Sequence, residues 1–276
     1  MSATTANAGL QATASYADIL QRERLLARRQ RTLVLAMLLV CSIALWVVGF
    51  FDAQRFQEGI PALGQLFSEM VPPDFGRLGH WIKPLADTLA MSIAGTALTV
   101  VLSLPLALLG ARNTAPHPWV GRLARTLLAA CRSVPEIILG IIFVAAVGFG
   151  ALPGVLALAL HSLGMVGKFY SEAIEHVDPK PLEAAVAAGG GRWHVIRYAV
   201  LPQVLPQLAD ITIYRWEYHF RASAVLGIVG AGGIGFELMA ALRLIKYDQV
   251  SAILLCILAC VLVVDSVGAA LRKRLK

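Results

Sequence analysis

The chain has 276 residues, of which 58% are hydrophobic and 15% are charged, and its formal net charge is +7. A soluble domain of this length carries more charge, and the apolar residues lie in long runs that are typical of membrane spans rather than of one large core. Lys and Arg are expected in excess on the cytoplasmic loops of a membrane protein, so the positive charge does not by itself indicate a nucleic-acid partner. The four cysteines also lie in apolar runs, without the spacing of a metal site or a disulfide framework.

The first predicted elements are a polar N-terminal segment, residues 1–31, and a membrane span at 32–51. A cleaved signal peptide has an apolar region of about 7–15 residues. The apolar region here has about 20 residues, enough to cross a bilayer, so we expect a retained span. Five arginines precede the span and predict a cytoplasmic N-terminus: Arg22, Arg24, Arg28, Arg29 and Arg31. Residues 52–83 carry nearly balanced charges and are expected to form a polar periplasmic loop.

Five more spans are predicted after that loop, at 84–111, 126–149, 154–170, 206–229 and 249–270. Pro105 predicts a kink in the first of these five. The loop at 112–125 and the tail at 272–276 are basic, which places both on the cytoplasmic side. The charges of all the short loops then agree with one topology. The predicted fold class is an all-α integral membrane protein with six transmembrane helices and with its N and C termini cytoplasmic.

The connection between the fourth and fifth spans is polar and has a distinctive spacing. It contains Glu183-Ala184-Ala185, three residues, Gly189, nine residues, and then Ala199-Val200-Leu201-Pro202. Pro181 suits the first turn of a helix, where its missing N–H costs nothing. Gly189 can end that helix in a left-handed conformation, and a second short helix is expected over 192–200. We therefore expect a helix–glycine–helix projection on the cytoplasmic side.

This spacing resembles the EAA loop of binding-protein-dependent ABC importer permeases, with Ala199 at a position where the family often has Ile. The resemblance implies a type I ABC importer permease fold, with its core over 84–274 and the EAA loop over 181–202. It also implies a homodimer of permease subunits, two cytoplasmic ATPase subunits and a periplasmic binding protein that delivers the substrate. The residues that it assigns to ATPase coupling are Glu183, Ala184, Ala185, Gly189, Leu201 and Pro202.

The chain has no G-x-x-x-x-G-K-[ST] phosphate loop, so we do not expect it to hydrolyse ATP. A permease subunit is expected rather than an enzyme, without a cofactor or metal ion of its own; ATP and Mg²⁺ would be bound by the partner ATPase subunits. Residues 230–235 match a dinucleotide-binding pattern, but a membrane span precedes them and no acid follows at the required distance. A flexible outer turn or a gate is expected instead, at Gly230, Gly232, Gly233 and Gly235.

Charged residues interrupt the fifth span between Tyr214 and Arg221. A charge at the centre of a span costs about 2.5–3.5 kcal/mol, so these side chains should face protein or water. At 100° per residue Arg215 and His219 share one helix face. Glu217 and Arg221 share the opposite face and are spaced to form an ion pair. The alternation of aromatic and charged residues leaves a locally unwound stretch open as the alternative to a helix.

The third span carries Arg132 and Glu136 four residues apart, and Glu136 could pair with Arg215. We consider two roles for these charges: an ion-pair network that clamps helices together, or a compensated route for an anionic substrate. The planar guanidinium of arginine suits phosphate-like groups because it makes paired, charge-assisted hydrogen bonds. The candidate substrate pathway consists of Arg215, Glu217, His219, Arg221, Arg132 and Glu136. His161 is interpreted as a polar interhelical contact.

Four stretches resemble the phosphonate import permeases within that family, over residues 72 to 274. They are Tyr214-Arg215-x-Glu217-x3-Arg221-Ala222, the glycine turn at 230–235, Cys131 to Glu136, and Ala157 to Ser162. The resemblance implies phosphonate import across the bacterial inner membrane. The same architecture with phosphite, hypophosphite or an amino acid as cargo is the first alternative. An intramembrane enzyme and a channel are two others, and neither explains a coupling loop.

Overall fold

Apolar runs punctuated by proline and glycine give this chain helices and turns, with no strand among the residues that the structure describes. The structure is a computed structural model that describes the backbone of residues 3–275 and the side chains of residues 23–274. Residues 1–2 of the predicted cytoplasmic segment, and Lys276 of the basic tail, lie outside this description. The described chain divides into two units, which meet between Gln65 and Leu66.

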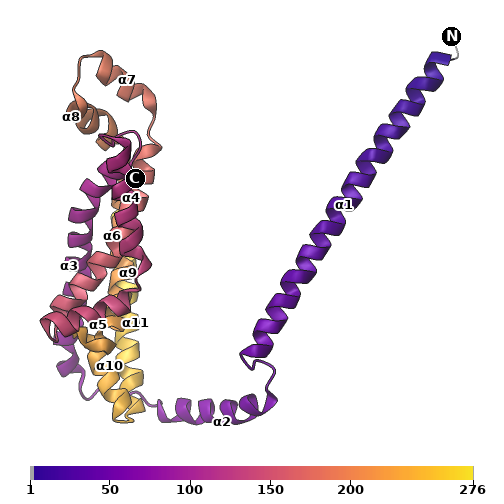
Figure 1. The fold of residues 1–276 in the computed structure, drawn as a ribbon. Helices are drawn as coiled ribbons and strands as arrows, with labels where there is room; N and C mark the ends of the chain where they lie inside the picture. The colour runs from indigo at the N-terminus through magenta and orange to yellow at the C-terminus, as the bar shows by residue number, and fades with distance from the viewer. Residues whose placement is uncertain (1–2, 276) are drawn as a thin grey trace. The chain divides into compact units, whose positions relative to one another are not determined.

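The first unit contains α1 and most of α2 (Figure 1). α1 (Ala3–Val47) is a single helix whose part from Glu23 to Val47 is long and apolar enough to cross a membrane. The predicted span at 32–51 overlaps this part of the helix and ends four residues beyond it.

The segment 52–83, predicted as a polar loop, is helical at both ends, in α2 (Ala53–Glu69) and from Leu78 onward, and its periplasmic location stays a prediction. Phe56, Ile60, Leu63 and Phe67 recur at helical spacing and are all exposed. An amphipathic helix of this kind is typical of a membrane surface. The mean polarity of the segment concealed this pattern.

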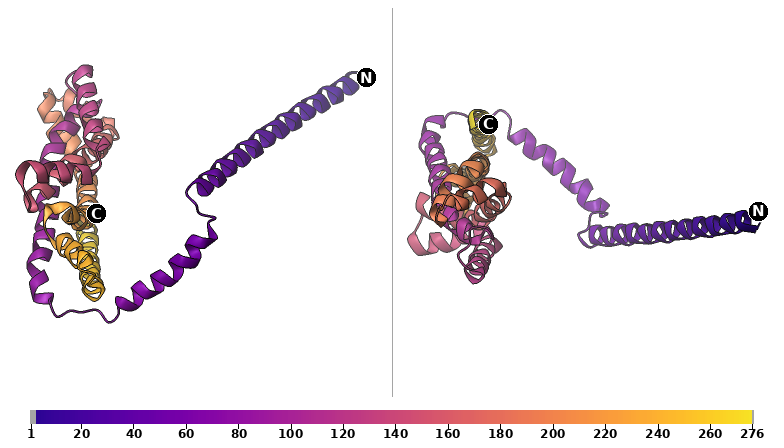
Figure 2. Two further views of the ribbon diagram at one scale, coloured as in Figure 1. Left: turned by 60° about the horizontal axis from the view of Figure 1, so that its bottom comes forward. Right: turned by 90° about the horizontal axis from the view of Figure 1, so that it is seen from above.

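The second unit is a bundle of helices that Figure 1 shows running side by side, and Figure 2 shows the same bundle from two further directions. α3 (Leu78–Gly110) packs most extensively on α6 (Ala151–Glu175). α9 (Leu201–Leu226) lies against both, and α11 (Tyr247–Leu275) packs on α9. The remaining elements are α4 (Pro118–Ser133), α5 (Glu136–Val147), α7 (Pro179–Ala187), α8 (Arg192–Val195), η1 (Ile196–Val200), η2 (Gly227–Ala231) and α10 (Ile234–Arg243). α7 and α8 lie at one end of the bundle and α10 at the other.

Three clusters of buried apolar side chains hold the bundle together along its length. One contains Tyr170 and Val204 near the α7 end, one contains Leu158 and Leu226, and one contains Trp81 and Ile253 near the α10 end. α9 contributes Val204 to the first of these clusters and Leu226 to the second, so this helix packs against its neighbours near both of its ends.

The predicted third span at 126–149 is not one straight helix. α4 and α5 meet at 85°, because Pro135 has no N–H to donate and excludes the helical conformation from Val134, whose φ and ψ are −93° and 123°. The helix that runs from Arg192 to Ala231 also bends, by 58°, into α10. Within residues 23–274 four helices could cross a membrane, or six if each bent pair counts as one span. The six predicted spans therefore match the count of six that includes the bent pairs. The cytoplasmic location of the two termini stays a prediction.

Candidate functional site

The charged stretch at the centre of the bundle lies in a regular helix. α9 is continuous from Leu201 to Leu226, so the alternative of an unwound stretch is wrong. Arg215 is 4% exposed, Glu217 6% and His219 0%. The predicted division into two faces is confirmed: Arg215 and His219 both contact α6, whereas Glu217 and Arg221 both contact α11.

A chain of hydrogen bonds connects Arg215 to His219 through α6 and continues to α3. Nε of Arg215 donates to Oγ of Ser162 at 2.8 Å, and the same oxygen lies 2.6 Å from Nε2 of His219. Nδ1 of His219 lies 2.7 Å from Oγ1 of Thr96, whose hydroxyl donates to the carbonyl of Ser92 at 2.7 Å. Since the Thr96 proton is used there, we assign the ring proton of His219 to Nδ1, and Ser162 then donates to Nε2. His219 thus fixes Ser162, and Ser162 fixes the guanidinium.

The guanidinium of Arg215 has two further neighbours and one unused donor. Nη1 donates to the sulfur of Met165 at 3.3 Å, and Cζ lies 4.1 Å from the centroid of the Tyr218 ring. Nη2 is buried and has no hydrogen-bond partner in the described part of the chain. A buried donor without a partner is costly, so Nη2 is a candidate ligand contact.

Glu136 does not form the ion pair with Arg215 that its position allowed; Tyr218 contacts both residues instead. The Tyr218 hydroxyl donates to Oε1 of Glu136 at 2.8 Å. Oε2 of Glu136 is buried, and among the described residues it too has no partner. The site therefore contains one unused donor and one unused acceptor.

The predicted ion pair between Glu217 and Arg221 is also wrong, because each residue has a partner on α11. Oε1 of Glu217 lies 2.7 Å from Nη1 of Arg272, and Nη1 of Arg221 lies 3.1 Å from Oδ1 of Asp265. Gly268 permits the close approach, since a Cβ atom there would collide with the Glu217 carboxylate. These two pairs join α9 to α11, as the alternative of a structural clamp expects.

Arg132 lies apart from the other candidate residues. The break at Pro135 puts it on α4 and Glu136 on α5, and no ion pair is found for Arg132 within residues 23–274. It lines a small cavity of about 240 Å³ with Arg112, Arg125 and Lys168. The interhelical contact predicted for His161 is confirmed, since Nδ1 lies 2.9 Å from the carbonyl oxygen of Val134.

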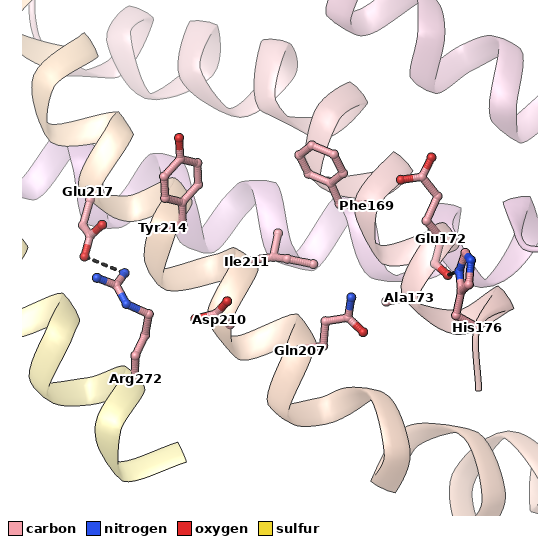
Figure 3. A pocket seen from close by; sticks show the side chains of 10 residues that line it. All are labelled: Phe169, Glu172, Ala173, His176, Gln207, Asp210, Ile211, Tyr214, Glu217 and Arg272. Carbon is pink, nitrogen blue, oxygen red and sulfur yellow. Dashed lines mark hydrogen bonds and ion pairs between the residues drawn. The ribbon is translucent and has the colours of Figure 1, made fainter. Parts of the chain in front are cut away.

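A groove of about 920 Å³ runs between α6, α9 and α11 on the side of Glu217 (Figure 3). Figure 3 shows the Glu217–Arg272 pair at one end of the lining and Glu172 with His176 at the other. Its lining residues are Phe169, Glu172, Ala173, His176, Gln207, Asp210, Ile211, Tyr214, Glu217 and Arg272. No group of three potential metal ligands is present in the described chain.

Two features of this site were not predicted, although each has a signal in the sequence. Gln207, Asp210, Tyr214 and Glu217 repeat every three to four residues, which marks one polar face of α9. Hydroxyl residues repeat in the same way along α3, at Thr88, Ser92, Thr96, Thr99 and Ser103, and all five are buried. A stripe of hydroxyl groups on an apolar helix indicates that polar partners pack against it.

The loop between α6 and α9 has the predicted helix–glycine–helix form. Its first helix begins at Pro179 rather than Pro181, because Asp178 caps it by accepting from N of Lys180 at 3.0 Å. Gly189 follows the helix with φ +81°, as predicted. α8 ends at Val195, and the expected second helix continues as the π-helical turn η1 into α9.

Most of the residues that the resemblance assigns to ATPase coupling lie on the surface of this loop. The structure describes every residue of this loop, and none of the residues of α7 is buried. Glu183, Ala184 and Gly189 are exposed, and a Cβ atom placed on Gly189 would find nothing described within 4 Å. Leu201 and Pro202 start α9, so the loop and the charged stretch belong to one continuous helical path.

In the glycine turn after α9, Gly230 and Gly235 are buried and Gly232 and Gly233 are partly exposed, and its role as a flexible turn or gate stays a prediction. Gly230, Gly232 and Gly233 have φ of +100°, +74° and +69°, values that favour glycine. A Cβ atom on Gly235 would collide with the carbonyl oxygen of Ala224. N of Ile234 donates to Oγ1 of Thr88 at 2.9 Å, which ties the turn to α3.

Comparisons with known proteins agree with this architecture. Residues 103–276 match the family described as binding-protein-dependent transport system inner membrane component. The chain is 63% identical over 237 residues to the phosphite transport system permease protein PtxC of Stutzerimonas stutzeri, covering 86% of each. It is 39% identical over 236 residues to the phosphate-import permease protein PhnE of Mycolicibacterium smegmatis, covering 85% of this chain and 44% of that one.

A solved structure shares the fold. An inward-facing structure of the MetNI methionine ABC transporter superposes with a TM-score of 0.65 at 21% identity, covering 74% of this chain and 99% of the matched chain. At this identity the likeness shows the fold alone.

Proposed function

The chain belongs to the binding-protein-dependent transport system inner membrane components, and we propose that it carries a phosphorus oxyanion, with phosphite as the first candidate. It is the permease subunit of an ABC importer in the bacterial inner membrane, and it is not itself an enzyme. The observation that carries the cargo proposal is the buried guanidinium of Arg215, whose Nη2 has no partner in the described chain. A desolvated arginine with a free donor suits a tetrahedral oxyanion.

The relatives favour phosphite over the phosphonate cargo that the sequence motifs imply. The relative with 63% identity is a phosphite permease and matches most of this chain. The resemblance of residues 214–222 to phosphonate permeases keeps a phosphonate as the second candidate. Both cargos present the same PO₃ group to Arg215, and they differ only in the substituent on phosphorus.

The exposed loop is proposed as the docking site for cytoplasmic ATPase subunits. α7 has nine residues and buries none of them within the described chain. An isolated helix of this length is marginal in water, so a partner surface would stabilise it. Gly189 lets that surface approach closely, and ATP and Mg²⁺ would be bound by the ATPase subunits and not by this chain. A periplasmic binding protein is proposed to deliver the cargo at the other face.

α9 is the element that we propose to transmit movement from the docked loop to Arg215. η1 and η2 lie at its two ends, and π-helical turns are frequent at functional sites. Nη2 of Arg192 donates to the carbonyl oxygen of Thr114 at 2.6 Å, a second connection between the loop and the bundle. A displacement of α7 and α8 would therefore reach both the centre of α9 and the glycine turn.

Two permease subunits per importer are proposed, either two copies of this chain or this chain with a second permease. Arg221 and Asp265 support this, because their paired side chains on the apolar bundle are 44% and 43% exposed and would gain cover from a second subunit. Co-purification of two differently tagged copies tests the homodimer: recovery of both tags supports it, and recovery of one tag excludes it.

Uptake in cells that depend on this importer tests the cargo. We expect labelled phosphite to accumulate, and unlabelled phosphite and methylphosphonate to compete more strongly than methionine. Accumulation should disappear when the ATPase subunits are deleted, because transport against a gradient needs ATP. A channel would instead still equilibrate the cargo across the membrane without ATP. Competition by methionine with none by either phosphorus oxyanion would refute the proposed cargo.

A further inference from the structure

Two buried polar atoms of opposite character lie without a partner near the middle of the described bundle. Nη2 of Arg215 is a donor and Oε2 of Glu136 is an acceptor. Hydrogen-bond partners are the rule for buried polar groups, and a charged group without one is especially costly. The pair therefore indicates a ligand that offers one acceptor and one donor.

Tyr218 places the two groups in one site. The guanidinium of Arg215 lies over the face of its ring, 4.1 Å from the centroid. Its hydroxyl donates to Oε1 of Glu136 at 2.8 Å. Because Tyr218 already satisfies Oε1, the remaining capacity of the carboxylate is at Oε2, on the helix α5 that packs against α9.

The charged and titratable groups around Glu136 leave Oε2 available. α5 packs on α6, α9 and η2. His161 of α6 faces the carbonyl of Val134, and η2 contains no titratable side chain. On α9 the groups are Arg215 and Tyr218, and no described cation lies within ion-pair distance of the carboxylate.

Resting on the proposed function, we propose that Arg215 and Glu136 together select the protonated monoanion of a phosphorus oxyanion. Nη2 of Arg215 donates to a P–O⁻ oxygen, and Oε2 of Glu136 accepts from the P–OH group. Phosphite and phosphonate monoanions offer both groups. The dianion has no hydroxyl and is repelled by the carboxylate, and sulfate is rejected for the same reason. Glu136 is thus a specificity-determining residue of the pathway.

Uptake as a function of pH tests the selection. The complete importer, with its ATPase subunits and binding protein, is reconstituted in vesicles that have the same pH on both sides. Phosphite uptake is measured at pH values below and above the second ionisation of phosphite. The ratio of wild-type to variant uptake is then compared between pH values. The pH dependence of the binding protein cancels in this ratio, because it contributes equally to both importers.

We expect the ratio of wild-type to Glu136→Gln uptake to fall about tenfold for each pH unit above the second ionisation. The reason is that the introduced amide can donate to the dianion, which the carboxylate repels. Glu136→Asp retains the carboxylate and should retain the wild-type pH dependence. Glu58→Gln, on the exposed face of α2, is the control and should give a ratio that does not change with pH.

A second measurement needs only the wild type, so it tests the inference even if the Glu136→Gln variant does not assemble. The pH at which uptake is half-maximal should move from phosphite to methylphosphonate by the difference between their second pKa values. A ratio that is independent of pH, or one midpoint for both cargos, overturns the inference and indicates that a fixed water joins the two atoms. Vesicles that take up neither cargo at any pH refute the proposed function instead.

Discussion

The ion pair between Glu217 and Arg272 should stabilise the contact between α9 and α11, and its two ends should respond unequally to substitution. Oε1 of Glu217 lies 2.7 Å from Nη1 of Arg272, and the side chains are 7% and 28% exposed. Arg272→Met leaves the buried carboxylate unpaired, which costs about 3–5 kcal/mol in free energy of unfolding. Glu217→Gln keeps an oxygen that can accept from Arg272, whose guanidinium reaches water, so about 1–2 kcal/mol is expected.

Thermal unfolding of the purified permease in detergent measures the difference. At about 2–4 °C for each kcal/mol in a protein of this size, Arg272→Met should lower the midpoint by roughly 6–20 °C and Glu217→Gln by roughly 2–8 °C. Arg274→Met is the matched control, because Arg274 is an exposed basic residue of the same helix, and it should shift the midpoint little. Adding Glu217→Gln to Arg272→Met should recover part of the loss.

Equal shifts for Arg272→Met and Glu217→Gln would show that the unpaired carboxylate is not the more costly end of the pair. Shifts no larger than that of Arg274→Met would show that the pair does not stabilise the contact. The same variants also separate the two faces of α9. If the face toward α11 is structural, the Glu217→Gln importer should transport phosphite at close to the wild-type rate per folded molecule.

Three further substitutions test the site, the loop and the turn. Ser162→Ala removes the bridge between Arg215 and His219 and leaves buried groups unpaired, so phosphite uptake should fall at least tenfold at about 1–3 kcal/mol lower stability; unchanged uptake would contradict the bridge. Gly189→Asp should abolish transport while the protein still inserts, as seen by membrane fractionation, and normal coupling of ATP hydrolysis to uptake in that variant would count against docking there. Gly235→Ala places a Cβ atom against the carbonyl of Ala224 and should cost about 1–3 kcal/mol in thermal unfolding, whereas an unchanged midpoint would show that the turn yields easily.

Features that depend on a single helix and its neighbouring residues could be predicted from the sequence. The two faces of α9 follow from 100° per residue, so the separation of Arg215 from Glu217 could be read from the sequence. The left-handed Gly189 follows from the preference of helix ends for glycine. Both predictions need only neighbouring residues, and the structure confirms both.

The partners across helices could not be read in this way. The i to i+4 spacing favoured a Glu217–Arg221 pair, but the packing of α11 offers each residue a separate partner. That packing depends on the missing side chain of Gly268, some 50 residues further along the chain. Tyr218 was likewise not expected between Arg215 and Glu136, because the direction of α5 depends on the bend at Pro135.

The break at Pro135 and the helix α2 also differ from the prediction, although the sequence carries a signal for each. The conformational restriction that Pro135 places on Val134 favours a break in the third span, although the apolar residues continue across it. The spacing of Phe56, Ile60, Leu63 and Phe67 is that of an amphipathic helix, although the segment is polar on average.

If a phosphorus oxyanion passes the buried guanidinium of Arg215, phosphite uptake by the assembled importer should depend on that side chain, and the Arg215→Gln variant measures this dependence. Loss of a charged hydrogen-bond donor, about 1.5–3 kcal/mol, should lower uptake about 10- to 100-fold. The amount of assembled complex should stay comparable to wild type, and Arg24→Gln, in the exposed part of α1, should transport normally. Wild-type uptake in a fully assembled Arg215→Gln importer would show that the cargo does not use this guanidinium.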